Sequence, residues 1–262
     1  MDLENLLQDW PGHAVDLAQL APPHGVVQVG WVDLTQPVPL ALAERLAAGL
    51  DGAERTRLGS FRFPEDRDAF LIGRSLIRGL LSRLLGVRPA EVPVTVGPHG
   101  RPGLAPGAHP GELSFNVSHT RGVLGFAVAR STVGLDVERF RRDPDPLAIG
   151  RQVFSPEELA VLAALPPDAQ RLRFRRLWTL KEAYLKARGT GLTLPAREVT
   201  CTLDVQPEGV RLSFTDAVGD APARWQCVEL RPTEHTWAAV CVEAEDRTRV
   251  QVHQAWLRLP GA

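Results

Sequence analysis

The stretch from Leu113 to Glu138 reads LSFNVSHTRGVLGFAVARSTVGLDVE and decides the fold class of this chain. It contains three apolar runs rich in β-branched and aromatic residues, Leu113 to Val117, Val123 to Ala129 and Thr132 to Val137, which predict three strands. A polar turn, Ser118 to Gly122, joins the first two runs. The sequence therefore predicts antiparallel strands in the middle of the chain.

Helical patterns lie on both sides of these strands. Upstream, Ala41 to Leu50 and the longer Arg67 to Leu85 carry apolar side chains near helical spacing. Downstream, Ser155-Pro156-Glu157-Glu158 supplies an N-cap, a proline at the first helical position and an acidic first turn. A second downstream helix is expected from about Asp168 to Arg188, ending at Gly189.

Further strand-like runs lie towards the two ends of the chain: Val26 to Val32, the region around Leu212, Trp225 to Leu230, and Trp237 to Val242. Each half of the chain thus contains one long helix and several strand candidates. We expect an α+β fold of two similar halves, each with a small antiparallel sheet packed on a long helix. The predicted halves are residues 1–131 and 132–262.

Composition excludes several classes of function. The chain has 30 basic and 31 acidic side chains and a formal charge of -1, so no overall field draws it to nucleic acid or to an anionic membrane. No apolar run approaches the roughly 18 residues of a membrane span, and the acidic start is unlike a secretory signal, so we expect a cytoplasmic protein. The three cysteines lack metal-ligand spacing and are expected to be reduced packing residues: Cys201, Cys227 and Cys241.

Two carboxylates lie close together near the end of the third predicted strand. Asp136 and Glu138 are two residues apart, so on a strand they point to the same face. Such a pair of hard oxygen ligands suits Mg²⁺, which completes its coordination with water and substrate phosphates. The alternative for an isolated Asp-x-Glu is a solvated strand end.

The last predicted helix contains the run Trp178-Thr179-Leu180-Lys181-Glu182-Ala183-Tyr184-Leu185-Lys186. Glu182 and Lys186 are one turn apart and can pair, although such pairs are also common on helix surfaces. Lys181 and Lys186 are the only lysines among the 30 basic residues, so the other 28 are arginine. This placement indicates that a compact ammonium is required here, as a point charge on a phosphate.

Other cationic and polar side chains are candidates for anion binding. His119, beside Ser118, becomes a donor to an anion if a phosphate lies nearby, and otherwise has a structural role. Arg101 lies in the Gly100-Arg101-Pro102 loop. Five arginines crowd a short upstream region, where most arginines simply solvate a helix surface and the sequence does not rank them: Arg57, Arg62, Arg67, Arg74 and Arg78.

Three motifs in order resemble those of the 4'-phosphopantetheinyl transferases. They are Phe115-Asn116-Val117-Ser118-His119, Gly134-Leu135-Asp136-Val137-Glu138 and Trp178-x-x-Lys181-Glu182-Ala183-x-x-Lys186. With Gly189-x-Gly191-Leu192 and looser matches upstream, the resemblance spans about residues 54 to 200 and is closest to the larger, surfactin-type (Sfp-like) branch. The ends of the chain, residues 1 to 50 and 200 to 262, are not covered.

This resemblance implies a monomer built as a pseudo-dimer, with coenzyme A and Mg²⁺, or alternatively Mn²⁺, in the cleft between its halves. It implies that Asp136, Glu138 and Glu182 hold the metal, and that Glu182 and Lys186 are catalytic. The implied cofactor-binding residues are Arg57, Arg74, Arg101, Ser118, His119, Lys181 and Lys186. The family often has lysine where Arg57 and Arg101 stand, and either cation can hold a phosphate.

The implied reaction is attack by a serine hydroxyl of an acyl or peptidyl carrier protein on the β-phosphate of coenzyme A, with 3',5'-adenosine bisphosphate leaving. Glu182 is the candidate base, with a water on the metal as the alternative. Carrier proteins of this kind are usually acidic, and two basic groups could meet them: Arg171, Arg173, Arg175 and Arg176, or Arg139, Arg141 and Arg142.

Two other classes of function remain as alternatives. A Mg²⁺-dependent phosphohydrolase with the same acids needs an activated water and no carrier protein, and release of phosphate from simple esters favours it. A non-catalytic carrier-binding protein is the second alternative, and binding of the carrier protein without any metal would favour it. Neither alternative explains the placement of the two lysines.

Overall fold

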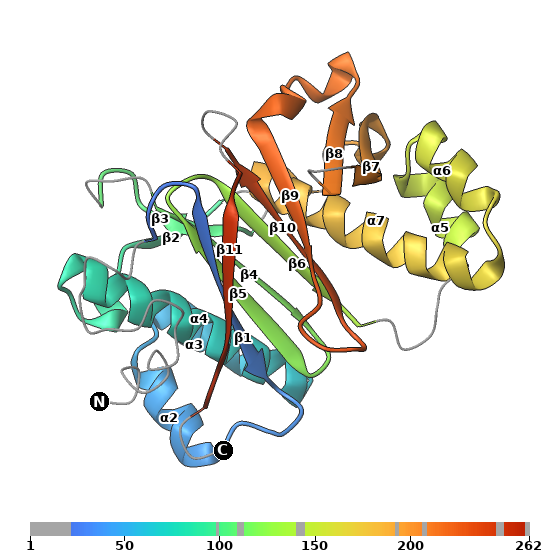
Figure 1. Ribbon diagram of the computed structural model, residues 1–262. Coiled ribbons are helices and arrows are strands. Elements are labelled where there is room, and N and C mark those ends of the chain that lie inside the picture. The colour runs from blue at the N-terminus through green and yellow to red at the C-terminus, as the bar shows by residue number, and fades with distance from the viewer. Residues whose placement is uncertain are drawn as a thin grey trace. The chain divides into compact units, whose positions relative to one another are not determined.

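The computed structural model describes residues 22–97, 100–108, 113–139, 145–191, 194–205, 209–244 and 249–259 (Figure 1). These residues form two compact units. The first runs to Arg130 and also includes the chain from Gln251 on, and the second extends from Ser131 to Val250. The division falls beside the boundary expected at residue 131. The last strand, however, returns to the first unit, whereas the sequence placed it in the second half.

A four-stranded sheet in the order β11-β1-β5-β4 forms the centre of the first unit. Its strands are β1 (Val26–Asp33), β4 (Ser114–Thr120), β5 (Val123–Ala129) and β11 (Gln251–Leu257). β5 pairs antiparallel with both β4 and β1, but β11 pairs with β1 in parallel. The sheet is therefore mixed, because its fourth strand comes from the other end of the chain.

Helices cover this sheet. They are α2 (Leu40–Ala48), α3 (Gly52–Gly59) and the 22-residue α4 (Pro64–Leu85), followed by the 3-10 helix η2 (Pro89–Glu91) and a two-stranded ribbon of β2 (Val94–Val96) and β3 (Pro102–Leu104). α4 crosses the sheet in Figure 1 and buries Leu76 and Leu80 against Phe126 of β5. The apolar face of α4 thus supplies the core of this unit.

The second unit contains a three-stranded antiparallel sheet in the order β6-β10-β9. Its strands are β6 (Val133–Glu138), β9 (Trp225–Leu230) and β10 (Trp237–Glu243), and a separate hairpin consists of β7 (Val199–Val205) and β8 (Gly209–Phe214). The helices are α5 (Pro146–Val153), α6 (Pro156–Ala163) and the 22-residue α7 (Pro167–Arg188), with the 3-10 helices η4 (Ala196–Glu198), η5 (Asp216–Val218) and η6 (Pro222–Arg224).

α7 packs directly on β6 and β10 (Figure 1). Its contact with β6 is so close that a Cβ atom on Gly134 would lie 2.1 Å from the carbonyl oxygen of Ala183 and 2.4 Å from the backbone nitrogen of Ala187. Only glycine fits at this point of the strand. Gly189 ends the helix in the left-handed conformation, with φ of 64°.

Local signals located most of these elements correctly. The α+β class is confirmed, and β5 and β9 have their predicted bounds. Ser155 caps α6 by accepting a hydrogen bond from the backbone of Glu158, and the Glu158 side chain accepts one from the backbone of Ser155. Six helices and strands were not predicted: α3, α5, β2, β3, β7 and β11.

Two expectations about particular residues were wrong. β4 continues to Thr120, so Ser118 and His119 belong to the strand and not to the turn, because their backbones pair with Gly125 and Leu124 of β5. Cys227 and Cys241 were expected to be reduced, but they lie opposite each other on β9 and β10 and form a disulfide. Cys201 is a free, buried thiol, as expected. Within the described part of the chain, no helix is long and apolar enough to cross a membrane.

Replacement of Gly134 by alanine should destabilise the protein by about 3 kcal/mol or more, because the new methyl group meets helix backbone that has no room to move. Thermal unfolding measures this loss. The matched control is Gly59→Ala in α3, where a Cβ meets nothing within 4 Å and alanine should be neutral or stabilise by up to about 1 kcal/mol. Equal stability of the two variants would contradict the close approach of α7 to β6.

Candidate active site

The strand β6 presents two acids to the helix α7. Every second residue of a strand points to the same face, so one face of β6 carries Gly134, Asp136 and Glu138. Because Gly134 touches the α7 backbone, Asp136 and Glu138 also lie on the face that α7 covers. The Asp136 side chain is only 4% exposed, whereas Glu138, at the end of the strand, is half-buried.

The helix α7 contributes three side chains, spaced four residues apart, to the same site: Trp178, Glu182 and Lys186. The ammonium of Lys186 lies 2.6 Å from Oδ1 of Asp136. The indole nitrogen of Trp178 donates a hydrogen bond of 3.4 Å to Oε1 of Glu138. Two polar contacts thus join the strand to the helix, and Glu182 lies on the same side of α7 as Lys186.

The excess negative charge changes the acidity of this cluster. Burial and the neighbouring Asp136 carboxylate raise the pKa of Glu138 to about 7, against the hydrogen bond from Trp178 and the charge of Lys186. Burial and Asp136 also raise the pKa of Glu182, again against the effect of Lys186. A cation placed among these carboxylates would offset the repulsion and keep Glu138 and Glu182 ionised.

The donor set suits an oxygen-loving divalent cation. Within the described residues no group of three His, Cys, Asp or Glu side chains is arranged to hold a metal ion. Mg²⁺ does not need such a group, because it commonly takes one or two carboxylates and fills its octahedron with water and substrate phosphates. An acidic cluster that water and phosphate oxygens complete is the arrangement such an ion uses.

Lys181 does not join this cluster. It lies five residues from Lys186, which places the two lysines about 140° apart around the helix axis. Its side chain is 3% exposed, and its ammonium pairs with Oε2 of Glu158 at 2.8 Å and donates to the carbonyl oxygens of Ala196 and Val199. The expectation that Lys181 contacts the cofactor does not match this placement, because its three N–H groups have protein acceptors.

Ser118 and His119 point to opposite faces of β4 in the first unit. Ser118 is buried and His119 is exposed. This follows from the alternation of side chains along a strand, so the two residues do not face a ligand from the same side. Arg101, also in this unit, is partly buried, and its Nη2 lies 3.2 Å from the hydroxyl of Ser114.

Two predicted anion-binding arginines meet around one aromatic ring. The guanidinium carbons of Arg57 and Arg74 lie 5.5 Å and 5.4 Å from the centroid of the Phe70 ring. Arg74 is nine-tenths buried, which lowers its pKa, and lies 3.7 Å from Oε1 of Glu54. Among the described residues, no atom accepts a hydrogen bond from its Nη1. The contact of Phe70 with these two arginines was not predicted.

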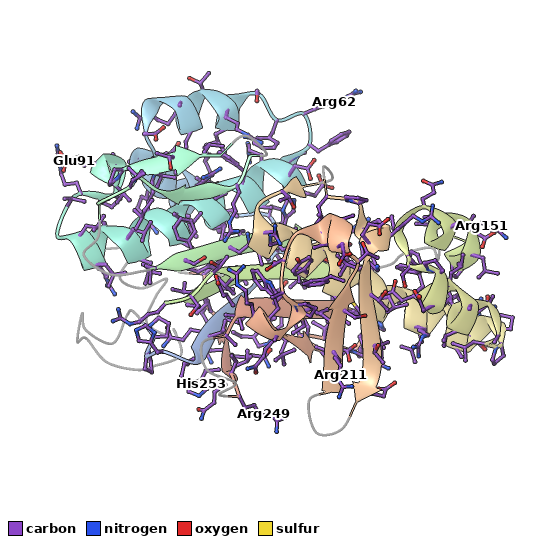
Figure 2. The ribbon with its side chains drawn as sticks, turned by 90° about the horizontal axis from the view of Figure 1, so that it is seen from above. Arg62, Glu91, Arg151, Arg211, Arg249 and His253 are labelled. Carbon is purple, nitrogen blue, oxygen red and sulfur yellow. A yellow bond between two sulfur atoms is a disulfide. The ribbon has the colours of Figure 1, made fainter. Side chains whose placement is uncertain are left out.

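The remaining arginines of this region are used differently. Arg78 is buried and pairs with Asp51 and Glu54, so it belongs to the core. Arg62 extends outward from the loop before α4 (Figure 2), with its guanidinium over the Phe63 ring. Position in the sequence could not separate these roles.

The basic groups expected to meet a carrier protein are also partly occupied. Arg176 pairs with Glu229 and Asp204, and Arg171 pairs with Asp168. Arg139 lies at the end of the described part after β6, while the predicted positions Arg141 and Arg142 lie outside the described residues.

Comparison with known proteins identifies the class to which this fold and site belong. Residues 132–241 match the sequence profile of the 4'-phosphopantetheinyl transferase superfamily, and residues 37–130 match that of the 4'-phosphopantetheinyl transferase N-terminal region. The two matches meet where the two units divide.

Individual relatives agree. The 4'-phosphopantetheinyl transferase HetI of Nostoc sp. is 35% identical over 78% of this chain and 83% of its own length. A 4'-phosphopantetheinyl transferase of Bacillus subtilis is 32% identical over 64% and 73%, and a phosphopantetheinyl transferase of Thraustochytrium sp. is 31% identical over 84% and 80%. The crystal structure of a holo-(acyl-carrier-protein) synthase of Bacillus anthracis is similar at 17% identity, with a TM-score of 0.36 over 44% of this chain and 97% of that one. The chain belongs to the 4'-phosphopantetheinyl transferase superfamily. It is an enzyme of the transferase class, as the motifs predicted.

Replacement of Glu138 by glutamine should stabilise the metal-free protein at alkaline pH. The folded-state pKa of about 7 lies above the ordinary value of 4.5, so the folded protein keeps a proton that the unfolded chain releases between these values. The contribution of Glu138 to stability is therefore greatest below pH 4.5 and is lost as pH rises through 7. Unfolding in the presence of a chelator should show a gain for Glu138→Gln of about 1 to 2 kcal/mol at pH 8 and much less at pH 5.

The control for this measurement is Glu44→Gln, which changes an exposed acid on α2. It should change stability by less than about 0.5 kcal/mol at both pH values. A Glu138→Gln protein that is no more stable at pH 8 than at pH 5, relative to wild type, would show that the carboxylate is not held in a repulsive, desolvated position.

Proposed function

We propose that this transferase moves the 4'-phosphopantetheine group of coenzyme A onto a serine of an acyl or peptidyl carrier protein, and that it does so with Mg²⁺ on Asp136, Glu138 and Glu182. The observation that carries the proposal is the contact of Lys186 with Asp136 beside two carboxylates of raised pKa. Three ionised carboxylates and one ammonium leave an excess of negative charge, which one divalent cation offsets.

Mg²⁺, when bound, supplies positive charge to the pyrophosphate oxygens and fixes their orientation. The protein's part is to hold its ligands in place. Trp178 donates to Glu138 and fixes the direction of that carboxylate, and the close contact at Gly134 fixes the distance from β6 to Glu182 on α7.

Glu182 is the group that accepts the proton of the carrier serine. Its side chain is half-buried on α7, and beside a bound cation it stays an ionised carboxylate that can take up a proton. As the serine Oγ bonds to the β-phosphorus, the bond from that phosphorus to the bridging oxygen breaks. The 3',5'-adenosine bisphosphate leaves with the electron pair.

Lys186 stabilises the negative charge that builds on the transferring phosphate and on the leaving oxygen. The Lys186 side chain is about one-third exposed, in contrast to that of Lys181, so Lys186 can reach a ligand as well as Asp136. An ammonium suits this role because it acts as a point charge with rotatable donors, so it can keep its hydrogen bonds while the phosphate changes shape during the reaction.

The nucleotide end of coenzyme A is assigned to the first unit. Arg57 is exposed, Arg74 offers an Nη1 that lacks an acceptor within the described residues, and both guanidinium groups lie near the Phe70 ring. Two guanidinium groups around an aromatic ring form a site for a phosphate group. Arg101 and His119 are further contacts in this proposal.

The carrier protein is expected to bring an acidic surface. We assign Arg173 and Arg175, in the first half of α7, to this contact. A monomer that works in the cytoplasm is part of this proposal.

The central test is the intact mass of a purified apo carrier protein after incubation with this enzyme, coenzyme A and Mg²⁺. A gain of about 340 Da is expected, the mass of one phosphopantetheine group. Glu182→Gln and Lys186→Met should each reduce the rate by at least about 100-fold, because each removes a group that acts in the transition state. The matched control, Glu157→Gln on the exposed side of α6, should retain the wild-type rate.

Three results would contradict the proposal. The first is a mass gain that persists with a chelator, and the second is an unchanged rate in both site variants. The third is hydrolysis of simple phosphate esters without carrier modification, which would favour the phosphohydrolase alternative.

Arg57→Met should raise the KM for coenzyme A by about 10-fold or more and change kcat by less than about 3-fold, because the lost contact binds ground state and transition state alike. Steady-state kinetics at saturating carrier protein measure both constants. The control is Arg45→Met on α2, which should leave both unchanged. A fall in kcat with constant KM would place Arg57 at the reacting phosphate instead.

A further inference from the structure

Lys181 remains to be explained, because it is one of only two lysines in the chain and lies outside the acidic cluster. Its ammonium has a carboxylate oxygen of Glu158 at 2.8 Å and the carbonyl oxygen of Ala196 at 2.7 Å, and it also donates to the carbonyl oxygen of Val199. The ring of Phe154 lies 5.8 Å from the same nitrogen. Three donors therefore meet three acceptors in a nearly water-free site.

Glu158 completes this buried group of contacts. Its side chain is 2% exposed. Besides Lys181, its Oε2 accepts a hydrogen bond of 2.8 Å from the backbone of Ser155, and its Oε1 accepts one of 2.7 Å from the backbone of Cys201. The pair Lys181–Glu158 thus connects the start of α6, the middle of α7, and the segment that runs through η4 into β7.

The shape of the site explains why lysine stands here in a chain otherwise rich in arginine. Two backbone carbonyls and one carboxylate surround a single nitrogen atom. A compact ammonium satisfies acceptors that converge on one point, whereas the planar fork of a guanidinium spreads its donors over a wider area. Arginine would need space that a site at 3% exposure lacks.

The location on α7 gives this pair a consequence for the active site. Glu182 follows Lys181 directly, and Lys186 lies about 140° away around the helix. On the active-site side the helix backbone rests on Gly134, two residues before Asp136. Any rotation of α7 about this contact would carry Glu182 and Lys186 away from the carboxylates of β6. The Lys181–Glu158 pair, on the other side of α7, opposes that rotation.

We propose that Lys181, through its buried pair with Glu158, is a positioning residue that sets the rotation of α7 and so places Glu182 and Lys186 for phosphopantetheinyl transfer. This inference rests on the proposed function for its kinetic readout. In this proposal Lys181 touches neither coenzyme A nor the metal, and it acts on the reaction only through the position of α7.

The test uses Glu158→Gln, which removes the charge partner of Lys181 and keeps an oxygen acceptor for the backbone of Cys201. A structural readout comes from selective ¹⁵N labelling of lysine side chains, since a tag-free chain contains only Lys181 and Lys186. The wild-type Lys181 ammonium should exchange slowly with solvent, and that of Lys186, with 31% of its side chain exposed, should exchange faster. In Glu158→Gln the NMR signal of the Lys186 ammonium should shift. Glu158 contacts Lys181 and not Lys186, so such a shift would report a movement of α7.

The kinetic readout is the rate of carrier modification. A misplacement of about 1 Å at a reacting group can cost about 100-fold, so kcat should fall by 10- to 100-fold while the KM for coenzyme A changes by less than about 3-fold. The Mg²⁺ concentration for half-maximal rate should also rise. The control for general destabilisation is Leu212→Ala, which opens the core at β8.

Leu212→Ala should lower the unfolding temperature but leave the Lys186 signal and the Mg²⁺ dependence unchanged. If Glu158→Gln fails to fold, Glu158→Gln with Lys181→Gln removes both charges and keeps polar groups at both positions. An unmoved Lys186 signal together with kinetics that match Leu212→Ala would overturn the inference. A wild-type enzyme that modifies no carrier would refute the proposed function, whereas the NMR comparison would still decide the role of Lys181.

Discussion

The contact between the backbone of α7 and Gly134 of β6 is the constraint on which the second unit depends. A helix that approaches a strand this closely has few allowed rotations, and its position decides which of its faces meets the carboxylates. Asp136 then lies within 2.6 Å of Lys186, although the two residues are 50 apart in the chain. The chemistry of the acidic cluster is therefore a consequence of backbone packing.

Two buried polar groups hold the helix in this position. One is the pair Lys181–Glu158, and the other is centred on Asp220, whose carboxylate accepts hydrogen bonds from Tyr184 and Trp225 and pairs with Arg188. Breaking a buried pair leaves a charge without compensation, so both groups strongly favour the observed arrangement. They flank the segment that carries Glu182 and Lys186, and thus combine a structural role with one in the function proposed above.

Lys181 and Lys186 show that the same sequence feature, a lysine in an arginine-rich chain, can have two different physical causes. Their isolation in an arginine-rich chain indicated that an ammonium is required at both positions, and the structure agrees for each. For Lys186 the requirement concerns Asp136 and, in the proposed function, a phosphate. For Lys181 it concerns converging acceptors in the interior. Neighbouring positions in a motif can thus have separate physical causes.

The sequence by itself determined the α+β class, the long helices, most strands, the shared face of Asp136 and Glu138, and the family, because these depend on local periodicity, capping and ordered motifs. Only the tertiary structure decided the parallel pairing of β11 with β1, the disulfide of Cys227 with Cys241, the contact of Phe70 with two arginines and the burial of Lys181. Those features join residues that are distant in the chain or lie on different faces of an element. No local pattern encodes such contacts, since they arise only when the elements pack.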